Sequence, residues 1–285
     1  MSVAVHVLAD DSVKFGSPTL AQHGVSLYVE LNDLVFLMDT GWNGRVVVDN
    51  AKKMRLNLKK VDAIFLTHCH YDHTGGLLEV LREIGKDELP IFAHPSLFRN
   101  SLVKRGRRLK YVGVPKDVSP EKVEEAGGKL VLADRPTEFL EGVWSTGEVP
   151  RKTKFEDTGL NAFTKRGNRL VKDPMKDDMS VVLKLEDGIV VLTGCSHAGV
   201  VNIIWQAMKV TNDERVLGVM GGFHLISASK ERIRRTVEEF ERLRVKKVVA
   251  GHCTGFEAQR AFSNTFGKRF MPMATGLKVT FGGRR

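Results

Sequence analysis

Residues 67–76 read Thr67-His-Cys-His-Tyr-Asp-His-Thr-Gly-Gly76, with the spacing His-x-His-x-Asp-His directly after an apolar run typical of a buried strand. In an extended segment His68 and His70 project to the same side, and a turn into the next helix lets Asp72 and His73 approach from a second direction. Imidazole nitrogens and carboxylate oxygens suit zinc, iron or manganese. This segment therefore predicts a site for one or two divalent metal ions.

Three further histidines lie at the ends of strand-like runs in the second half of the chain. His197 follows the apolar run that ends at Thr193, His252 follows another that ends at Gly251, and His224 lies between them. The ends of strands are natural platforms for ligands in α/β proteins. All three are candidate site residues, and core packing or helix capping is the alternative for each.

Hydrophobic periodicity along the chain predicts an α/β fold. Helices are expected over 44–57, from Gly75 to Ile84, over 200–208 and, as an amphipathic surface helix, from Ser229 onward. With 285 residues and 42% hydrophobic content, the chain is long enough for a substantial core, so we expect one globular unit over 1–285. The expected strands lie near 3–8, 25–31, 34–39, 61–66, 180–186, 188–194, 215–221 and 246–250.

The charge balance is strongly basic, with a formal net charge of +10. Such a surface concentrates anions and favours a phosphorylated small-molecule partner. A solvated surface adapted to high temperature is the plainer explanation, since glutamine is scarce and charged residues are plentiful. Aromatic residues make up only 7% and do not alternate with basic ones, which disfavours nucleic acid as a partner. Nothing in the sequence indicates an oligomeric state.

Three features favour a cytoplasmic location. The N-terminal residues lack the pattern of a signal peptide, and no apolar run approaches the roughly 20 residues that cross a bilayer. The chain has three cysteines, Cys69, Cys195 and Cys253, and each lies within two residues of a histidine. An odd number of cysteines cannot form a complete set of disulfides within one chain, so a reducing compartment fits better.

Two charged segments, 100–117 and 149–178, contain few apolar residues and are expected to be long loops. Extended connections of this kind commonly shape a substrate pocket, although solvated insertions are the alternative. Within or near the second segment, basic residues are candidates for binding substrate phosphates, or else solvated charges: Arg151, Lys152, Lys154 and Lys172.

The metal motif and the strand-end histidines together resemble the metallo-β-lactamase superfamily over almost the whole chain. The resemblance implies a four-layer αβ/βα sandwich of two mixed sheets with outer helices, and an active site at the sheet edge between the two halves. It also implies that His68 and His70 bind one metal ion and that Asp72 and His73 bind another, which makes Asp72 a catalytic residue as well. Zinc is the expected metal, with manganese, iron or magnesium as alternatives.

The chain departs from the usual pattern of this superfamily at two places. Cys195 stands where relatives usually have a metal-bridging aspartate, and the stretch 144–150 lacks the histidine that they usually offer there. The departure suggests that His197 completes the first metal site, with Cys195 as a further ligand or a packing residue, and it leaves Glu148 as a substitute ligand. His252 resembles the last ligand of the second metal.

The resemblance also implies roles for residues around the metals. Asp39, in a strand-end Asp-Thr-Gly, is expected to orient a ligand by hydrogen bonding, or to serve as a turn or cap residue. His224 matches in order the histidine with which phosphodiesterase members protonate a leaving oxygen, with packing as the alternative. His23, next to a glycine and just before a strand, is expected to line the mouth of the substrate pocket or to form a turn.

A series of short motifs narrows the resemblance to one branch, similar to 7,8-dihydropterin-6-methyl-4-(β-D-ribofuranosyl)-aminobenzene-5′-phosphate synthase. That name implies condensation of a dihydropterin diphosphate with a ribofuranosylaminobenzene phosphate and loss of diphosphate, in methanopterin biosynthesis. A metal-dependent hydrolase that activates water against a phosphodiester, ester, lactone or thioester is the alternative, and a nuclease comes third. The motifs include His23-Gly-Val-Ser, Asp39-Thr-Gly, Asp49-Asn-Ala, Gly147-Glu-Val-Pro-Arg, Asp177-Asp, Gly221-Gly-Phe-His-Leu and His252-Cys-Thr-Gly.

Overall fold

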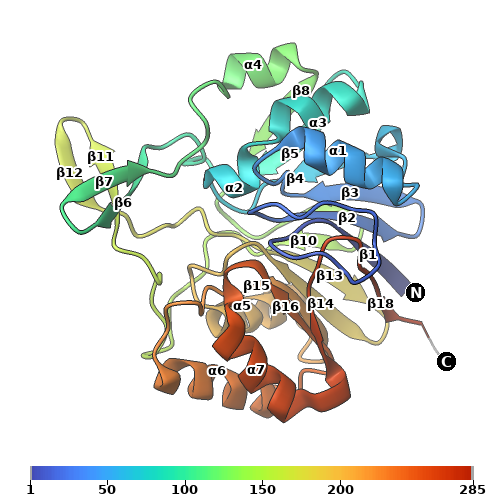
Figure 1. Cartoon of the computed structure of the whole chain (residues 1–285), viewed down its shortest axis with the longest axis vertical. Helices are drawn as coiled ribbons and strands as arrows, with labels where there is room; N and C mark the ends of the chain where they lie inside the picture. Colours follow the sequence, from blue (N-terminus) through green and yellow to red (C-terminus); the bar gives the residue numbers. More distant parts are fainter. Residues whose placement is uncertain (1, 284–285) are drawn as a thin grey trace.

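The computed structural model describes residues 2–283, which form two seven-stranded sheets packed face to face (Figure 1). The first sheet has the order β18-β1-β2-β3-β4-β5-β8 and consists of β1 (Ser2–Ala9), β2 (Ser26–Leu31), β3 (Leu34–Met38), β4 (Ala63–Phe65), β5 (Leu89–Ala93), β8 (Gly128–Leu132) and β18 (Lys278–Gly282). The second has the order β17-β16-β15-β14-β13-β10-β9 and consists of β9 (Thr137–Leu140), β10 (Val143–Ser145), β13 (Val181–Leu185), β14 (Gly188–Thr193), β15 (Val216–Gly222), β16 (Val248–Gly251) and β17 (Phe270–Pro272).

Both sheets are mixed in the same way. The run β3-β4-β5-β8 is parallel in the first sheet and the run β14-β15-β16-β17 is parallel in the second, whereas the remaining neighbours are antiparallel. Ligands of α/β proteins bind outside the carboxyl ends of parallel strands. We therefore expect a ligand site at the edge of the molecule where the parallel strands of both sheets end.

Helices cover the outer face of each sheet. The first is covered by α1 (Gly44–Lys53), α3 (Leu77–Ile84) and α4 (Pro120–Glu125), and the second by α5 (Val200–Thr211), α6 (Lys230–Arg242) and α7 (Phe256–Phe266) (Figure 1). The short helix α2 (Tyr71–Thr74) lies at the site edge, and single 3₁₀ turns occupy Leu58–Lys60, His252–Thr254 and Gly267–Arg269. The predicted four-layer sandwich is confirmed. Within residues 2–283, no helix is long and apolar enough to span a bilayer.

The four layers follow from alternation along the strands. In β3, Phe36 packs between the sheets, whereas Leu37 packs against the helices of the first half. In β14, Val190 packs between the sheets and Val191 packs under α5. Each of these side chains is fully buried, and burying one such side chain is worth about 1.5–3 kcal/mol. The central strands are therefore hydrophobic on both faces, as their continuous apolar runs predict.

The prediction of two long loops is wrong in part. Segments 100–117 and 149–178 contribute β6 (Ser101–Arg105), β7 (Arg108–Tyr111), β11 (Ala162–Arg166) and β12 (Arg169–Lys172), which form a third, four-stranded sheet with the order β12-β11-β6-β7. Each hairpin turns through two residues that begin with a glycine at positive φ, Gly106 at 59° and Gly167 at 58°. The many Lys and Arg residues obscure the alternation of apolar and polar residues that indicates strands. The two glycines at the turns are the sequence signal that could have indicated the hairpins.

The strands predicted from the sequence are confirmed, with ends that shift by at most two residues. The helix expected from Ser229 is confirmed as α6, and the Ser229 hydroxyl caps it by accepting a hydrogen bond from the Arg232 amide. The helix expected over 44–57 ends earlier, at Lys53, and the one expected from Gly75 begins two residues later, as α3.

Candidate metal centre

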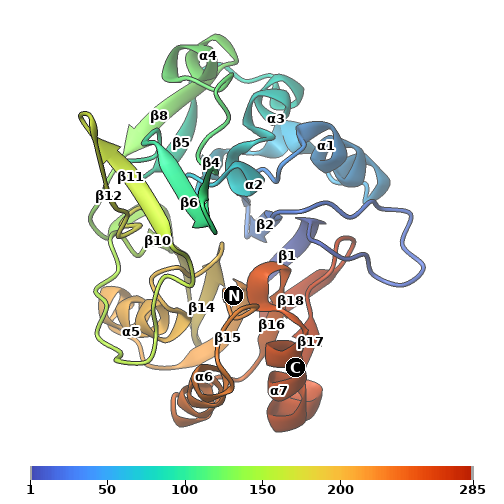
Figure 2. The ribbon, with the colours of Figure 1, turned by 60° about the vertical axis from the view of Figure 1, so that its left-hand side comes forward.

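The candidate ligands meet at one edge of the sandwich, where the carboxyl ends of the parallel strands of both sheets come together (Figure 2). The loop after β4 carries His68 and His70 into α2. The loops after β14 and β16 carry His197 and His252 from the other sheet. The site is therefore assembled from both halves of the chain.

Three buried histidines form the first group. The ring centroids of His68 and His70 lie 4.6 Å apart, and those of His197 lie 5.1 and 5.0 Å from them, respectively. The Nε2 atom of each ring is buried and has no hydrogen-bond partner in the described chain. Leaving a buried polar atom unsatisfied costs about 1–3 kcal/mol. Three such nitrogens, on rings whose centroids lie 4.6–5.1 Å apart, fit a shared cation.

Hydrogen bonds at the opposite ring nitrogens orient two of these imidazoles. Nδ1 of His197 lies 2.9 Å from the carbonyl oxygen of Thr158, and Nδ1 of His68 lies 3.0 Å from the hydroxyl oxygen of Thr67. Burial lowers the pKa of His68 and of His197 well below the usual value, and lowers the pKa of His70 to about 4. All three rings are therefore neutral near pH 7, which is the state that binds metals.

The second group combines Asp72, His73, Cys195 and His252, whose ligand atoms all lie within 4.8 Å of one another. Oδ2 of Asp72 is 3.7 Å from Nε2 of His73 and 3.3 Å from Nε2 of His252. Sγ of Cys195 is 3.2 Å from Nε2 of His73. A carboxylate, two imidazoles and a thiol are donors that zinc accepts.

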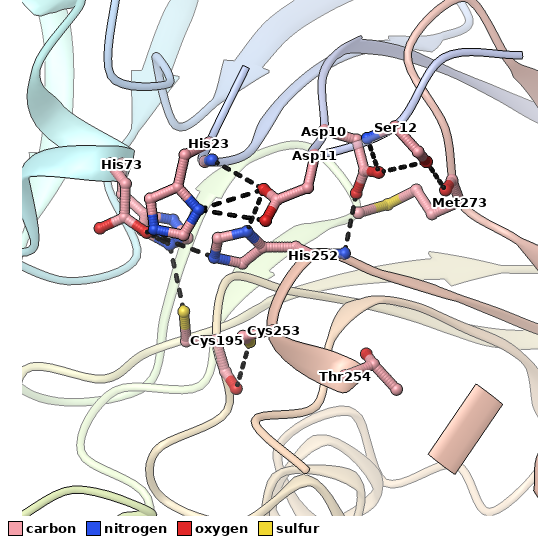
Figure 3. A network of polar contacts seen from close by, with 12 residues as sticks. Asp10, Asp11, Ser12, His23, His73, Cys195, His252, Cys253, Thr254 and Met273 are labelled. Carbon is pink, nitrogen blue, oxygen red and sulfur yellow. Dashed lines mark hydrogen bonds and ion pairs between the residues drawn. The ribbon is translucent and has the colours of Figure 1, made fainter. Parts of the chain in front are cut away.

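Two aspartates hold the histidines of this group from behind. Oδ2 of Asp39 lies 2.6 Å from Nδ1 of His73, and Asp39 also accepts hydrogen bonds from the amide and hydroxyl of Thr67. Oδ1 of Asp11 lies 2.9 Å from Nδ1 of His252, a contact marked by a dashed line in Figure 3. Each carboxylate fixes a proton on Nδ1, so that Nε2 presents its lone pair to the centre.

A model of the metallo-β-lactamase superfamily matches residues 21–252. The chain belongs to the metallo-β-lactamase superfamily. It is 34% identical over 287 aligned residues to the 7,8-dihydropterin-6-methyl-4-(β-D-ribofuranosyl)-aminobenzene-5′-phosphate synthase of Methanocaldococcus jannaschii, covering 98% of this chain and 97% of the relative. The family and the branch expected from the motifs are thereby confirmed.

Solved structures of this superfamily have the same fold. The crystal structure of Tm1679, described as a metal-dependent hydrolase of the β-lactamase superfamily, is 30% identical, with a TM-score of 0.81 and coverage of 97% of this chain and 98% of the other. The zinc-bound PqqB of Methylobacterium extorquens is 14% identical, with a TM-score of 0.55 and coverage of 97% and 99%. The second likeness shows the fold alone.

Cys195 occupies the position between the two groups, where metallo-β-lactamase relatives usually have an aspartate. Its Sγ lies within 4.8 Å of ligand atoms of the second group and also of those of His68 and His197. A third set joins Cys195 with His224 and Cys253, again within 4.8 Å. The imidazole of His224 lies 4.3 Å from that of His197 between ring centroids, so His224 is next to the first group.

Asp11 was not among the site residues predicted from the sequence. It accepts from Nδ1 of His23 at 3.1 Å as well as from His252, and Nε2 of His23 lies 3.4 Å from Asp72 (Figure 3). Burial opposes ionisation of Asp11, but the hydrogen bonds from both histidines outweigh it and lower the pKa of the carboxyl. The available signal was its place just beyond the first strand, at the same edge as the other site residues.

The adjacent acids Asp177 and Asp178 tie the two ligand loops together. Asp177 accepts the amide of Cys69 at 2.9 Å and forms a buried ion pair with Arg99. Asp178 accepts the amide of Ala198 at 2.8 Å. These contacts fix the backbone on either side of the first group of histidines.

Glu148 lies away from both metal groups. Its carboxylate pairs with His94 at 3.3 Å and with Lys176 at 3.1 Å. The substitute-ligand role is therefore left without a supporting contact.

The basic residues expected to bind phosphate also lie elsewhere. Arg151 donates to the carbonyl oxygens of His197 and Pro174, which supports a loop of the site from behind. Lys172 donates to the side chain of Asn161, and the Lys152 and Lys154 side chains are exposed. None of these four lines the cavity at the metal groups.

That cavity has a volume of about 250 Å³ and opens between the two sheets and the small third sheet. Three of the site residues predicted from the sequence line it, namely His23, Asp72 and His224. Its other walls include residues that the sequence did not single out, namely Asp11, Tyr71, Val103, Arg105, Lys110, Val112, Gly159, Leu160 and Ile226.

Proposed function

We propose that this chain is a metal-dependent enzyme that joins two phosphorylated small molecules with loss of diphosphate, as the name of its Methanocaldococcus jannaschii relative implies. The observation that carries the proposal is a set of three adjacent buried imidazoles with unpartnered Nε2 atoms, close to an Asp-His-His-Cys group. The substrate would be a dihydropterin diphosphate, and the acceptor a ribofuranosylaminobenzene phosphate.

In this proposal His68, His70 and His197 hold one divalent ion, and Asp72, His73 and His252 hold the second. Cys195, whose Sγ lies within 4.8 Å of ligand atoms of both sets, would serve as a further thiolate donor. Nitrogen and sulfur donors favour zinc over magnesium. A divalent cation at such a site neutralises the negative charge that builds up on a leaving diphosphate.

The remaining residues have roles that follow from their contacts. Asp39 and Asp11 keep protons on Nδ1 of His73 and His252, as their distances support. His224 lines the cavity beside the first group and would give its proton to the departing oxygen. The three cysteines are free and buried, and a thiolate ligand must stay reduced, which supports placement in the cytoplasm.

A metal-dependent hydrolase is the second candidate. The observation in its favour is the 30% identity and 0.81 TM-score to Tm1679, which is described as such a hydrolase. The two candidates share the metal centre and differ in whether an arylamine or a water molecule receives the group.

One experiment tests both. The protein is purified without chelator, its metals are counted by elemental analysis, and diphosphate release from a dihydropterin diphosphate is followed with and without the aminobenzene acceptor. We expect about two ions per chain and release that requires the acceptor. Release without acceptor would support the hydrolase, whereas no metal and no turnover after zinc addition would overturn both.

A further inference from the structure

The β6–β7 hairpin presents one face to the cavity at the metal centre. Val103 is paired with Lys110 and Arg105 with Arg108, and directly paired residues project from the same face of a sheet. Residues two apart along a strand also share a face. Val103, Arg105 and Lys110 all line the cavity, so this is the face turned toward the metal groups. Lys104 projects from the opposite face.

This inner face carries positive charge that the protein does not neutralise. Among residues 2–283, no carboxylate forms an ion pair with Arg105, Arg108 or Lys110. Arg105 stands directly opposite Arg108 across the hairpin, and like charges in that position destabilise a strand pair. An anion bound near both guanidinium groups would reduce this repulsion. The pairing of Arg105 with Arg108 therefore favours a negatively charged ligand.

Arg105 and Lys110 are the only Lys or Arg residues of the described chain that line the cavity. The two acids that line it, Asp11 and Asp72, are already paired with histidines at 2.9 and 3.3 Å, respectively. A phosphate that enters therefore meets cations on the hairpin side and the metal groups on the other. The hairpin cations and the metal groups line the same cavity.

Apolar and aromatic side chains line the same cavity. Val112, Leu160 and Ile226 line the cavity with Tyr71, and Nζ of Lys110 lies 5.5 Å from the centre of the Tyr71 ring. Apolar walls with a few placed polar groups are typical of small-molecule sites. A flat ring fits such walls.

We propose that the inner face of the β6–β7 hairpin binds the phosphate group of an aromatic phosphate, with the ring against Tyr71 and the reacting end at the metal centre. Arg105 and Lys110 make the contacts, and Arg108 adds charge from the tip of the hairpin. Guanidinium groups suit phosphate oxygens because they donate two parallel hydrogen bonds. The inference deepens the proposed function, since it rests on the same cavity and names the class of substrate.

The test compares Arg105→Ala/Lys110→Ala with Lys104→Ala, which removes a cation from the outer face of the same hairpin. Phenyl phosphate is titrated into the zinc-loaded proteins by calorimetry at constant ionic strength, with benzyl alcohol as the uncharged probe. We expect the double variant to lose at least about tenfold in phenyl phosphate affinity, with metal content and melting temperature unchanged. Lys104→Ala keeps its affinity, and neither variant changes the response to benzyl alcohol.

Two results would overturn the inference: unchanged phenyl phosphate affinity in the double variant, or an equal loss in Lys104→Ala, which would indicate general surface charge. In steady-state assays the double variant should raise KM at least about tenfold with little change in kcat. The binding readout needs no turnover. Hairpin-dependent binding without any synthase activity would therefore refute the proposed reaction and support the phosphate site.

Discussion

Nδ1 of His73 lies 2.6 Å from Oδ2 of Asp39, and both side chains are completely buried. Asp39 reaches this position with a backbone φ of 59°, a conformation that non-glycine residues adopt rarely and at a cost of about 1–3 kcal/mol. The carboxylate also accepts two hydrogen bonds from Thr67, directly before the metal motif. One aspartate thus fixes both the ring of His73 and the start of the ligand loop.

Asp39→Asn should weaken metal binding by about 10–100-fold, because an amide can donate as well as accept and no longer enforces the proton on Nδ1 of His73. The measurement is competition for zinc against a fluorescent chelator. Asp33→Asn, an exposed change in the turn before β3, is the control and should match the unaltered protein. Equal zinc affinity in both variants would show that Asp39 has no part in the centre.

His197→Ala should lower the metal content from about two ions per chain to about one, since it removes a donor from the first group only. Elemental analysis after dialysis measures the number of metal ions per chain. His94→Ala is matched to it as another buried histidine, bonded to Ser96 and Glu148 away from the metal groups. Full metal content in His197→Ala would remove this residue from the ligand set.

The two metal groups should load differently with pH. Burial keeps the pKa of His68, His70 and His197 low, so the first group has no protons to lose near neutrality. Burial also acts on His73 and His252, but neighbouring groups outweigh it: Asp39 and Asp72 raise the pKa of His73, and Cys253, Asp11 and Asp72 raise that of His252.

A metal must therefore displace protons from the second group, and its affinity there falls as the pH falls. Calorimetric zinc titrations between about pH 5.5 and 8.5 should show one affinity that depends weakly on pH and one that weakens more strongly on acidification, with more protons released at the second step. Two affinities that change in parallel with pH would contradict this assignment of protons.

Gly159→Ala should slow turnover about tenfold or more while metal content stays unchanged. A methyl group there would lie 2.3 Å from Cδ2 of His224, so the ring must move away from the reacting oxygen. Gly167→Ala is the matched control, since its φ of +58° resembles the +68° of Gly159 but nothing lies within 4 Å. Steady-state kinetics should separate them, and equal rates in the two variants would argue against a positioned His224.

Asp177→Ala should destabilise the fold by about 3–5 kcal/mol, because it leaves Arg99 with a buried charge beside the remaining Asp173. Glu231→Ala breaks an exposed pair with Arg234 on α6 and should cost less than about 1 kcal/mol. Urea unfolding followed by circular dichroism gives both values. Similar losses in the two variants would mean that the Arg99 pair contributes no more than a surface contact.

The elements closest to short motifs were the easiest to predict. The ligand loop at 67–76 combines a buried strand, a turn and a helix within a few residues, so its geometry follows from local periodicity. The two mixed sheets came from the family resemblance, because the order of strands is a long-range property that periodicity does not encode.

Residues that depend on distant pairing escaped prediction. Asp11 meets His252 across 241 positions of the chain, and no local pattern signals that contact. Arg105 and Lys110 looked like solvated loop charges, because their role as one face of a strand pair depends on the register of the hairpin. The basic residues around 151–172 looked equally suitable, and only the fold shows that Arg151 is occupied by carbonyl groups.

The first metal group takes His68 and His70 from one half of the sandwich and His197 from the other. An ion held there would crosslink the two halves of the sandwich, which otherwise contact each other through apolar side chains. Removal of the ion would weaken the contact between the two halves first at the edge where substrate enters. Protease cleavage at this edge should therefore increase when the metal is lost, before the whole protein unfolds.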